Sequence, residues 1–397
     1  MKDELARRLS ALEPIGLDPS GATTRLAWTP EDASAGAWFC AQAAELGLRV
    51  ERDPAGNRWA VPDAAPPWWA VGSHLDSVRD GGRFDGALGV AAAFAVAGRC
   101  SQPVAVIALA DEEGARFNTP TFGSKALAGA LDVAGVLDRV DDDGVRLRDA
   151  LAGAGIDPAA LSAAPGWLDR LRGFVELHID QNRAVAAAGV PAGVVSALAT
   201  RMRLRVAIDG QADHAGSTHG EERHDALGAA ARLIVAAQDL GEAVDGLVVS
   251  ATRILVEPNA LTTIPASVQL WVDGRSAAPD TLVAWERALH EQAQSIAQRL
   301  RVTIALERAS HTLGVSFDER VRGALSEASA RRGAAAHEFL CFAGHDAGVL
   351  AQRVPAGMVL VRNETGISHA PAEDVDLDDA ALAASVVLDA IEELAAP

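Results

Sequence analysis

Four short apolar runs, each followed at once by polar residues, constrain the fold of this 397-residue chain more than any other feature. The runs are 69–72, 104–109, 174–177 and 358–361. Such runs, alternating with helical patterns, are typical of buried strands in α/β layers. The polar clusters are His74-Leu75-Asp76, Asp111-Glu112-Glu113-Gly114, His178-Ile179-Asp180-Gln181 and Ser368-His369. Because ligands of open α/β sheets bind beyond the carboxyl ends of the strands, we expect these clusters to meet at one edge.

The middle of the chain follows a different pattern. Residues 203–208 and 267–273 alternate with period two, and helical patterns lie near 225–239 and 279–300. This combination predicts a small α+β domain over residues 201–311, inserted into a larger domain built from residues 1–200 and 312–397. The length of the chain, which is long for one hydrophobic core, also favours two domains.

The chain carries 35 lysines and arginines against 54 aspartates and glutamates, a formal net charge of −19. This acidic balance argues against nucleic acid or an anionic membrane as a partner, because phosphate surfaces need a basic footprint. The N-terminus lacks the apolar segment of a signal peptide, and the longest uncharged apolar stretch, 86–98, is too short to cross a bilayer. Three widely spaced cysteines without a CxxC pair fit a reducing compartment, so we expect a cytoplasmic protein.

Three histidines and two carboxylates in or near these clusters form a candidate metal site. They are His74, Asp85, Glu113, His178 and His369. Imidazole and carboxylate ligands suit zinc, manganese, cobalt or nickel. Five ligands exceed the needs of one open tetrahedral site and suit two ions if Asp85 bridges them. The glycines around Asp85 would let the backbone approach closely, and Asp76 could hold the second nitrogen of His74.

Glu112 and Glu113 are adjacent, so one can bind metal while the other faces water as the general base. Such a base needs a pKa raised toward neutrality by its surroundings. For either acid taken alone, a solvated loop charge is the simpler interpretation. The presence of four clusters at four strand ends favours the catalytic interpretation.

At this point the chain resembles the amidase/hydantoinase/carbamoylase group of the dinuclear-metal aminoacylase and carboxypeptidase superfamily. The matching motifs are Ser73-His74-Leu75-Asp76-Ser77-Val78, Gly81-Gly82-Arg83-Phe84-Asp85-Gly86, Glu112-Glu113-Gly114-Ala115-Arg116-Phe117, Glu176-Leu177-His178-Ile179, His214-Ala215-Gly216-Ser217-Thr218, Gly344-His345-Asp346-Ala347 and Gly366-Ile367-Ser368-His369-Ala370-Pro371-Ala372-Glu373. They span nearly the whole chain in the order of the group. The group includes N-carbamoyl-L-amino acid hydrolases, allantoate amidohydrolases and β-ureidopropionases.

The resemblance implies a role for each matching residue. The five candidate ligands match the metal ligands of the group, with Asp85 bridging, and Glu112 matches the catalytic acid and base. His214 matches a histidine that polarises the scissile carbonyl and comes from the partner subunit. The residues implied at the substrate are Gln181, Arg203, Thr262, Arg275 and His345. The implied fold is α/β, a discontinuous catalytic domain with a mixed, mostly parallel sheet flanked by helices, plus an inserted smaller α+β lid and dimerisation domain.

Several of these residues have a simpler alternative. His214 could be a turn histidine, Arg275 could be a surface charge, and His345 could form a structural pair with Asp346 beside the site. A guanidinium is, however, the natural bidentate clamp for a carboxylate, which favours Arg275 as a substrate residue.

The sequence departs from the group where the substrate would bind. Glutamate and glycine are usual where this chain has Asp180 and Asn182, and asparagine is common at the position of Thr262. A threonine hydroxyl is shorter than an asparagine side chain and offers one donor. The changed context of His219 is a further departure. We therefore expect retained hydrolysis with a changed substrate.

The expected activity is hydrolysis of the carbamoyl C–N bond of an N-carbamoyl-L-amino acid or related ureido acid, with release of ammonia and carbon dioxide. Allantoate hydrolysis is the first alternative. An aminoacylase or dipeptidase and a non-catalytic metal-binding protein are the others. The expected partners are two divalent metal ions, a small anionic ureido or amide substrate, and a second copy of the chain bound through the lid domain.

Overall fold

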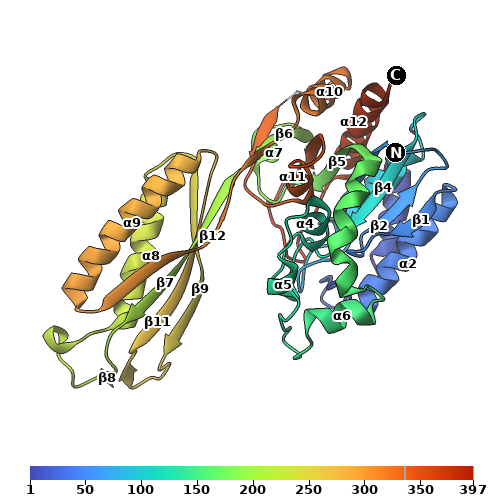
Figure 1. Ribbon diagram of the computed structural model, residues 1–397. Coiled ribbons are helices and arrows are strands. Elements are labelled where there is room, and N and C mark those ends of the chain that lie inside the picture. Colours follow the sequence, from blue (N-terminus) through green and yellow to red (C-terminus); the bar gives the residue numbers. More distant parts are fainter. Residues whose placement is uncertain (335–336, 397) are drawn as a thin grey trace. The chain divides into compact units, whose positions relative to one another are not determined.

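The computed structural model describes residues 1–334 and 337–396, and the chain divides into two compact units (Figure 1). The large unit comprises Met1–Ala197 and Ser316–Pro397, and the small unit comprises Leu198–Val315. Each unit has its own hydrophobic core. The functions assigned to the two predicted domains, catalysis for one and closure and dimerisation for the other, remain predictions at this point.

A nine-stranded sheet runs through the large unit. Its strands are β1 (Arg49–Arg52), β2 (Arg58–Val61), β3 (Trp68–His74), β4 (Val104–Leu109), β5 (Leu171–Ile179), β6 (Ala192–Leu198), β13 (Val315–Ser316), β14 (Glu338–Cys341) and β15 (Ala356–Val361). The order is β1-β2-β4-β3-β5-β15-β6-β13, and β14 also pairs with β6. The helices of this unit are α1 (Lys2–Leu12), α2 (Pro30–Glu45), α3 (Ala87–Ala97), α4 (Phe122–Ala128), α5 (Val133–Val136), α6 (Leu147–Gly153), η1 (Pro158–Arg170), α7 (Ala184–Ala187), α10 (Glu319–Arg331), α11 (Asp346–Leu350) and α12 (Leu377–Ala395).

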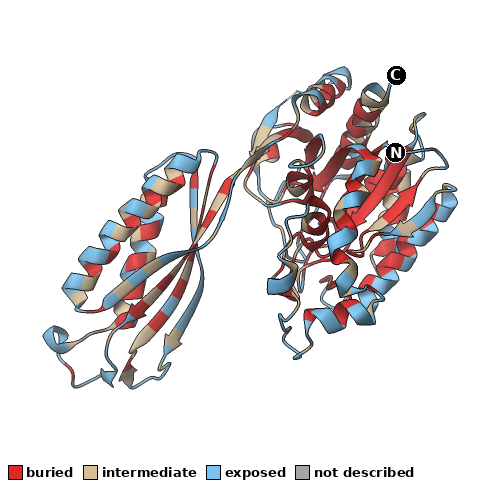
Figure 2. Ribbon diagram, viewed as in Figure 1, coloured by how far each residue is buried: buried red, intermediate tan, exposed pale blue. Residues whose placement is uncertain are grey.

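The four central strands of this sheet, β4, β3, β5 and β15, are parallel to one another, whereas β2 and β6 pair with them in the antiparallel sense. Parallel strands covered on both faces are apolar along their whole length, and these strands are buried throughout except at one residue of β5 (Figure 2). The mixed, mostly parallel α/β sheet expected from the sequence is thus confirmed. The four apolar runs are the four central strands.

Two histidines lie within strands, although the sequence predicted them in the polar clusters after the strands. His74 is the last residue of β3 and pairs with Leu109 of β4, and His178 lies inside β5 opposite Leu360 of β15. The backbone hydrogen bonds of the sheet continue past the apolar residues, so pairing with the neighbouring strand, rather than hydrophobicity, sets the end of each strand.

Helix α3 lies in the centre of the core of the large unit. Ten of its residues, from Ala87 to Val96, are buried, and it packs against β3, β4 and β5 as well as α1 and α12. A helix that is apolar on all sides is expected to be surrounded by other elements. The Phe94 ring lies 4.9 Å from that of Phe39 and 6.0 Å from that of Trp38, measured between centroids.

The small unit combines an antiparallel sheet with helices that cover one face. Its strands are β7 (Thr200–Asp209), β8 (Asp213–His214), β9 (Leu247–Glu257), β10 (Thr263–Ile264), β11 (Ser267–Ser276) and β12 (Thr303–Thr312), and its helices are η2 (Gly220–Glu222), α8 (Ala226–Glu242) and α9 (Pro279–Leu300). The four-stranded sheet has the order β12-β7-β11-β9. Alternate residues of β7, such as Met202 and Leu204, are fully buried under the helices, as their period of two indicates.

Among the described residues, no helix is long and apolar enough to cross a membrane.

The core around α3 gives a test of the fold. We expect Phe94→Ala to lower the free energy of unfolding by about 3–5 kcal/mol, because the cavity removes contacts with two aromatic rings. Val140→Ala, a half-exposed position in the same unit, is the control and should change it by no more than about 0.5 kcal/mol. Denaturant unfolding of the full chain measures both, and equal effects would contradict the assignment of this core.

Candidate active site

The two oxygens of the Asp85 carboxylate face two different groups of side chains. Oδ1 lies 3.0 Å from Nε2 of His178 and 3.3 Å from Nε2 of His74. Oδ2 lies 3.3 Å from Nε2 of His369, which is in turn 3.6 Å from Oε1 of Glu113. The five predicted ligands therefore meet around one carboxylate, which is itself buried.

Four segments bring these residues to the carboxyl ends of the central strands. His74 and His178 end or nearly end β3 and β5, Glu113 lies in the loop after β4, and His369 lies in the loop after β15. Asp85 immediately precedes α3. The expected meeting of the clusters at one sheet edge follows from the parallel order of these strands.

The backbone around Asp85 is fitted closely to its neighbours. A Cβ atom at Gly86, which has φ +64°, would lie 2.4 Å from the ring of His74, and one at Gly82 would lie 2.4 Å from Oε1 of Glu373. That same oxygen of Glu373 accepts hydrogen bonds of 2.9 Å from the backbone amides of Phe84 and Asp85. The glycines permit this approach, and Glu373 fixes the segment that carries the shared carboxylate.

His178 is oriented by a buried glutamate behind it. Nδ1 of His178 lies 3.3 Å from Oε1 of Glu176, and that oxygen accepts a 2.8 Å hydrogen bond from the hydroxyl of Ser73. The other Glu176 oxygen accepts the backbone amide of Ala347 at 2.8 Å. A carboxylate on the far nitrogen of an imidazole fixes its ring and tautomer, which leaves Nε2 directed at Asp85.

Asp76 differs from the prediction in one respect. The atom closest to Nδ1 of His74 is the backbone oxygen of Asp76 at 3.0 Å, while its carboxylate is 3.6 Å away. The carboxylate instead accepts the backbone amides of Glu112 and Glu113, at 3.2 and 3.1 Å. Two backbone donors compete for the oxygens that were expected to serve His74, so Asp76 anchors the loop after β4.

The electrostatics of this cluster favour a cation at its centre. Burial alone would raise the pKa of Asp85, yet the imidazoles of His178, His369 and His74 hold it well below its usual range. Burial alone would lower the pKa of His178, yet Asp85 and Glu176 raise it to about 9. The buried anion thus favours positive charge on the surrounding imidazoles. A divalent ion would supply that positive charge and displace the protons from the imidazole nitrogens.

The donor set fits divalent metal ions. The ligand atoms of His74, Asp85 and His178 lie within 4.8 Å of one another, and so do those of Asp85, Glu113 and His369. Nε2 of His74 and Oε1 of Glu113 are buried and have no hydrogen-bond partner among the residues that the structure describes, which is costly for a polar atom unless a ligand binds it. Mixed imidazole and carboxylate donors suit zinc, manganese, cobalt or nickel.

Glu112 belongs to neither ligand group and lies beside both. Its Oε2 is 3.9 Å from Nε2 of His74, and its side chain is buried. Burial, aided by the charges of Glu113 and Asp346 and opposed by that of His74, raises the pKa of Glu112 well above its usual range. A carboxyl group with a raised pKa is suited to accept and release a proton in a reaction.

Two predicted substrate residues lie in or behind the metal cluster. Nε2 of Gln181 donates to Oδ2 of Asp85 at 2.9 Å and lies 3.3 Å from Nε2 of His369. His345 is buried, its ring centroid is 4.5 Å from that of His178, and both of its ring nitrogens lack a hydrogen-bond partner among the described residues. Its ring therefore makes no hydrogen bond to Asp346, the structural partner considered in the sequence, and instead packs against His178.

The other predicted residues lie in the small unit, where they form two groups. Arg203 and Arg275 share one carboxylate, because Asp273 accepts the former at 2.9 Å and the latter at 2.8 Å. Nδ1 of His214 accepts the backbone amides of Gly216 and Ser217 at 3.0 and 3.2 Å. A neutral His214 therefore carries its proton on Nε2, as a donor to a carbonyl oxygen requires.

Thr262 lies next to His214 in the small unit. Its backbone oxygen accepts the amide of Ala215 at 2.9 Å, and its neighbour Thr263 pairs with His214 between β8 and β10. The short β8–β10 ladder thus brings together two predicted residues that are separated by 48 positions in the sequence, 262 − 214.

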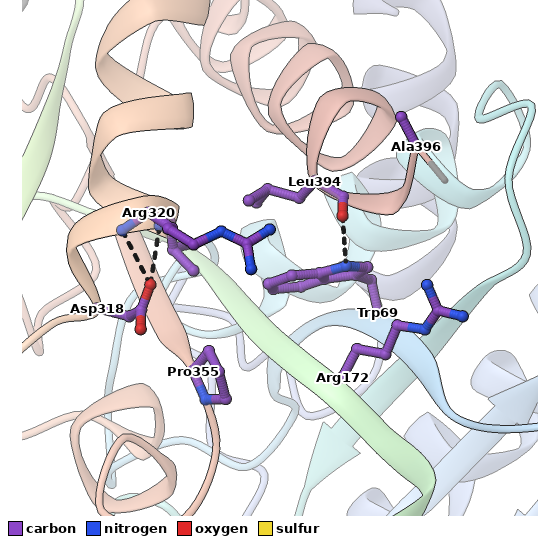
Figure 3. Close-up of a pocket in the computed structure, with 8 residues that line it drawn as sticks. Trp69, Arg172, Asp318, Arg320, Pro355, Leu394 and Ala396 are labelled. Carbon is purple, nitrogen blue, oxygen red and sulfur yellow. Dashed lines mark hydrogen bonds between the residues drawn. The ribbon is translucent and has the colours of Figure 1, made fainter.

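A pocket of about 390 Å³ lies at the amino ends of the central strands of the large sheet (Figure 3). Trp69, Arg172 and Pro355 line it, and these residues stand at the beginnings of β3, β5 and β15. Because parallel strands point the same way, this pocket and the metal ligands lie at opposite ends of the strands. Donor chemistry rather than cavity size identifies the candidate active site.

Comparison with known proteins shows the family of this chain. The model of peptidase family M20/M25/M40 matches residues 60–393. An N-carbamoyl-L-amino acid amidohydrolase from Geobacillus stearothermophilus is 34% identical over 99% of this chain and 98% of its own length. An allantoate amidohydrolase from Bacillus subtilis is 28% identical over 94% of this chain and 93% of its own length. The crystal structure of a hydantoinase/carbamoylase family amidase from Burkholderia vietnamiensis has a TM-score of 0.87 at 31% identity, and covers 100% of this chain and 98% of that one.

The fold and the paired ligand groups define a metal-binding hydrolase of C–N bonds. The chain belongs to peptidase family M20/M25/M40, and the resemblance found in the sequence motifs is confirmed.

Asp85→Asn tests the shared carboxylate. A carboxamide offers one neutral oxygen in place of two charged ones, so we expect the bound metal per chain to fall to less than half of the wild-type value. Elemental analysis after reconstitution and dialysis measures this, with the exposed acid variant Asp142→Asn as a control that keeps the wild-type metal content. Wild-type metal content in Asp85→Asn would show that this carboxylate is dispensable for binding.

Proposed function

We propose that the protein hydrolyses the carbamoyl C–N bond of an N-carbamoyl-L-amino acid or a related ureido acid. The observation that carries the proposal is the sharing of Asp85 between two three-residue ligand groups, with Glu112 beside them and outside both. The names of the relatives support the choice of substrate class.

Each group of ligands would hold one divalent ion. His74 and His178 would hold the first, Glu113 and His369 the second, and Asp85 both. Such ions lower the pKa of water toward neutrality and polarise a carbonyl oxygen.

Proton transfer is assigned to Glu112. Its buried carboxylate takes a proton from the attacking water and then delivers it to the leaving nitrogen of the substrate. The raised pKa of Glu112 supports its use as both base and acid. Hydrolysis of a carbamoyl group in this way gives the free amino acid, ammonia and carbon dioxide.

His214 is assigned to the carbonyl oxygen of the substrate. The backbone amides on Nδ1 leave a proton on Nε2, and this N–H would donate to the oxygen as negative charge develops there. A donor of this kind contributes on the order of 3 kcal/mol to the stabilisation of the transition state.

The carboxylate of the substrate is assigned to Arg275, with Arg203 beside it. Asp273 accepts hydrogen bonds from both guanidinium groups and holds them beside one another, and a guanidinium is the natural bidentate partner of a carboxylate. Thr262 would replace the longer amide common in the group, which leaves room for a different substrate. Allantoate, another ureido acid, is therefore the second candidate.

An ammonia-release assay with metal-loaded protein tests the reaction. The panel contains N-carbamoyl-L-amino acids, allantoate and N-carbamoyl-β-alanine, and we expect turnover of at least one. Glu112→Gln should retain its metal and lose a factor of roughly 10²–10⁴ in kcat, because the amide cannot transfer the proton. Release from none of these compounds would overturn the function, and full activity of Glu112→Gln would overturn the assignment of the base.

We also propose a homodimer formed through the small unit. Strand β9 is an edge of the small sheet and exposes the apolar side chains of Val248, Ile254 and Leu255. An unpaired edge strand with apolar residues is a template for pairing with a second chain. The proposal places His214 in the active site of the partner, as the family resemblance implies. The cytoplasm remains the proposed compartment, because the three cysteines of the chain are widely spaced and form no CxxC pair.

Subunit complementation tests this dimer. Glu112→Gln and His214→Ala homodimers should both be nearly inactive. A co-expressed mixed dimer, purified with two different tags, should regain about half of the wild-type kcat, because one of its two sites has both residues. A mixed dimer no more active than its parents would show that His214 acts within its own subunit or not at all.

A further inference from the structure

The loop of residues 110–121, between β4 and α4, carries both Glu112 and Glu113 and closes on itself. The amide of Gly123 donates to the oxygen of Ala110 at 2.8 Å, that of Phe122 to Asp111 at 3.0 Å, and that of Thr121 to Glu112 at 2.7 Å. Loops with adjacent ends keep their shape only if that closure is held.

One side chain from outside the loop binds both of its ends. Oδ1 of Asn57 accepts the amide of Ala110 at 2.8 Å, and Nδ2 donates to the oxygen of Gly123 at 3.3 Å. The second proton of Nδ2 goes to Oδ2 of Asp53 at 2.7 Å. Asn57 is fully buried, and all three hydrogen bonds require its amide to face one way.

The position of Asn57 is itself fixed from behind. Asp53 accepts the indole N–H of Trp59 at 2.9 Å and the backbone amides of Ala55 and Asn57 at 2.9 and 3.1 Å. These residues form the turn between β1 and β2, and β2 pairs with β4 up to Arg58 and Ala108. Asn57, the residue before Arg58, therefore lies beside the end of β4, where the loop leaves the sheet.

There is no space for a side chain at Gly123, where the loop closes. A Cβ atom on Gly123 would lie 1.9 Å from Oδ1 of Asn57. The loop also holds Asp111 and Thr121 in the left-handed region, at φ 51° and 55°. Such conformations cost about 1–3 kcal/mol each and persist only where the surroundings impose them.

We propose that Asn57 is a positioning residue of the active site, which closes this loop and so holds Glu113 for metal binding and Glu112 for proton transfer. It touches neither the metal ligands nor the substrate and acts only through the two ends of the loop. The part that concerns Glu112 rests on the proposed function, whereas the part that concerns the loop and the metal does not.

Two variants of the full chain break the closure in different ways. Asn57→Asp keeps the size of the side chain but sets a second carboxylate against Asp53. Gly123→Ala keeps Asn57 and forces its amide away, so it decides the question if Asn57→Asp does not fold. The control is Gln42→Ala, which removes a buried partner of Arg8 between α1 and α2, far from the loop in sequence and with no contact to it.

Hydrogen exchange is the first measurement, and it needs no substrate. In both variants the amides of Ala110, Thr121, Phe122 and Gly123 should exchange at least roughly tenfold faster than in wild type, while those of β3 and β5 do not change. Titration of the metal-free protein with Zn²⁺ or Mn²⁺ should show a Kd raised roughly 10–100-fold. With a substrate from the panel, kcat should fall roughly 10–100-fold with little change in KM.

Two results would overturn the proposal: loop exchange equal to that of Gln42→Ala, or faster exchange with the kcat and metal affinity of that control. If the wild type turns over no ureido acid, the proposed function fails. Exchange and metal affinity then still decide whether Asn57 positions the loop.

Discussion

Repulsion among buried carboxylates is the constraint on which the rest of this site depends. Asp76, Asp85, Glu112, Glu113 and Glu176 all lie at the carboxyl ends of three adjacent parallel strands, largely removed from water. Like charges in such a setting raise one another's pKa, unless positive charge or hydrogen-bond donors compensate. Backbone amides serve Asp76, imidazoles serve Asp85, and a hydroxyl and an amide serve Glu176. At Glu112 and Glu113 the nearby imidazoles only partly offset burial, which raises the pKa of Glu113 to about 7.

This unequal compensation separates the roles of the acids. Where donors saturate a carboxylate, it supports a neighbour, as Glu176 supports His178 and Glu373 supports the backbone of Asp85. Where imidazoles surround it, as at Asp85, it is suited to hold cations. Glu112, whose pKa stays raised despite the charge of His74 and which belongs to neither ligand group, is the acid suited to move a proton. The carboxyl group is thus suited to three roles at this end of the strands, namely support of a neighbour, cation binding and proton transfer, and its surroundings decide which role it has.

The sequence predicted the central strands, because each depends on a short-range pattern. Motifs of consecutive residues also named the candidate ligands and Glu112, which the structure brings together. Asp76 was predicted to hold Nδ1 of His74, and it does so with its backbone oxygen. A spacing of two residues does not distinguish that oxygen from the carboxylate. Glu176 and Glu373 lie inside the matched motifs, but their hydrogen bonds to Ala347 and Asp85 are set by strand order and loop packing.

Other contacts left no signal in the sequence. Asn57 meets Ala110 across 53 positions because β2 pairs with β4. In the same way, the sharing of Asp273 by Arg203 and Arg275 follows from the register of β7 against β11, which pairs Arg203 with Asp273. Those contacts depend on which strands become neighbours, a property of the whole fold.

The central claim is that Asp85 joins two metal ions, and X-ray absorption on the reconstituted protein tests it most directly. The account predicts nitrogen and oxygen ligands only, together with scattering from a second metal at about 3.5–4 Å. Fully loaded protein without that metal–metal distance would contradict it.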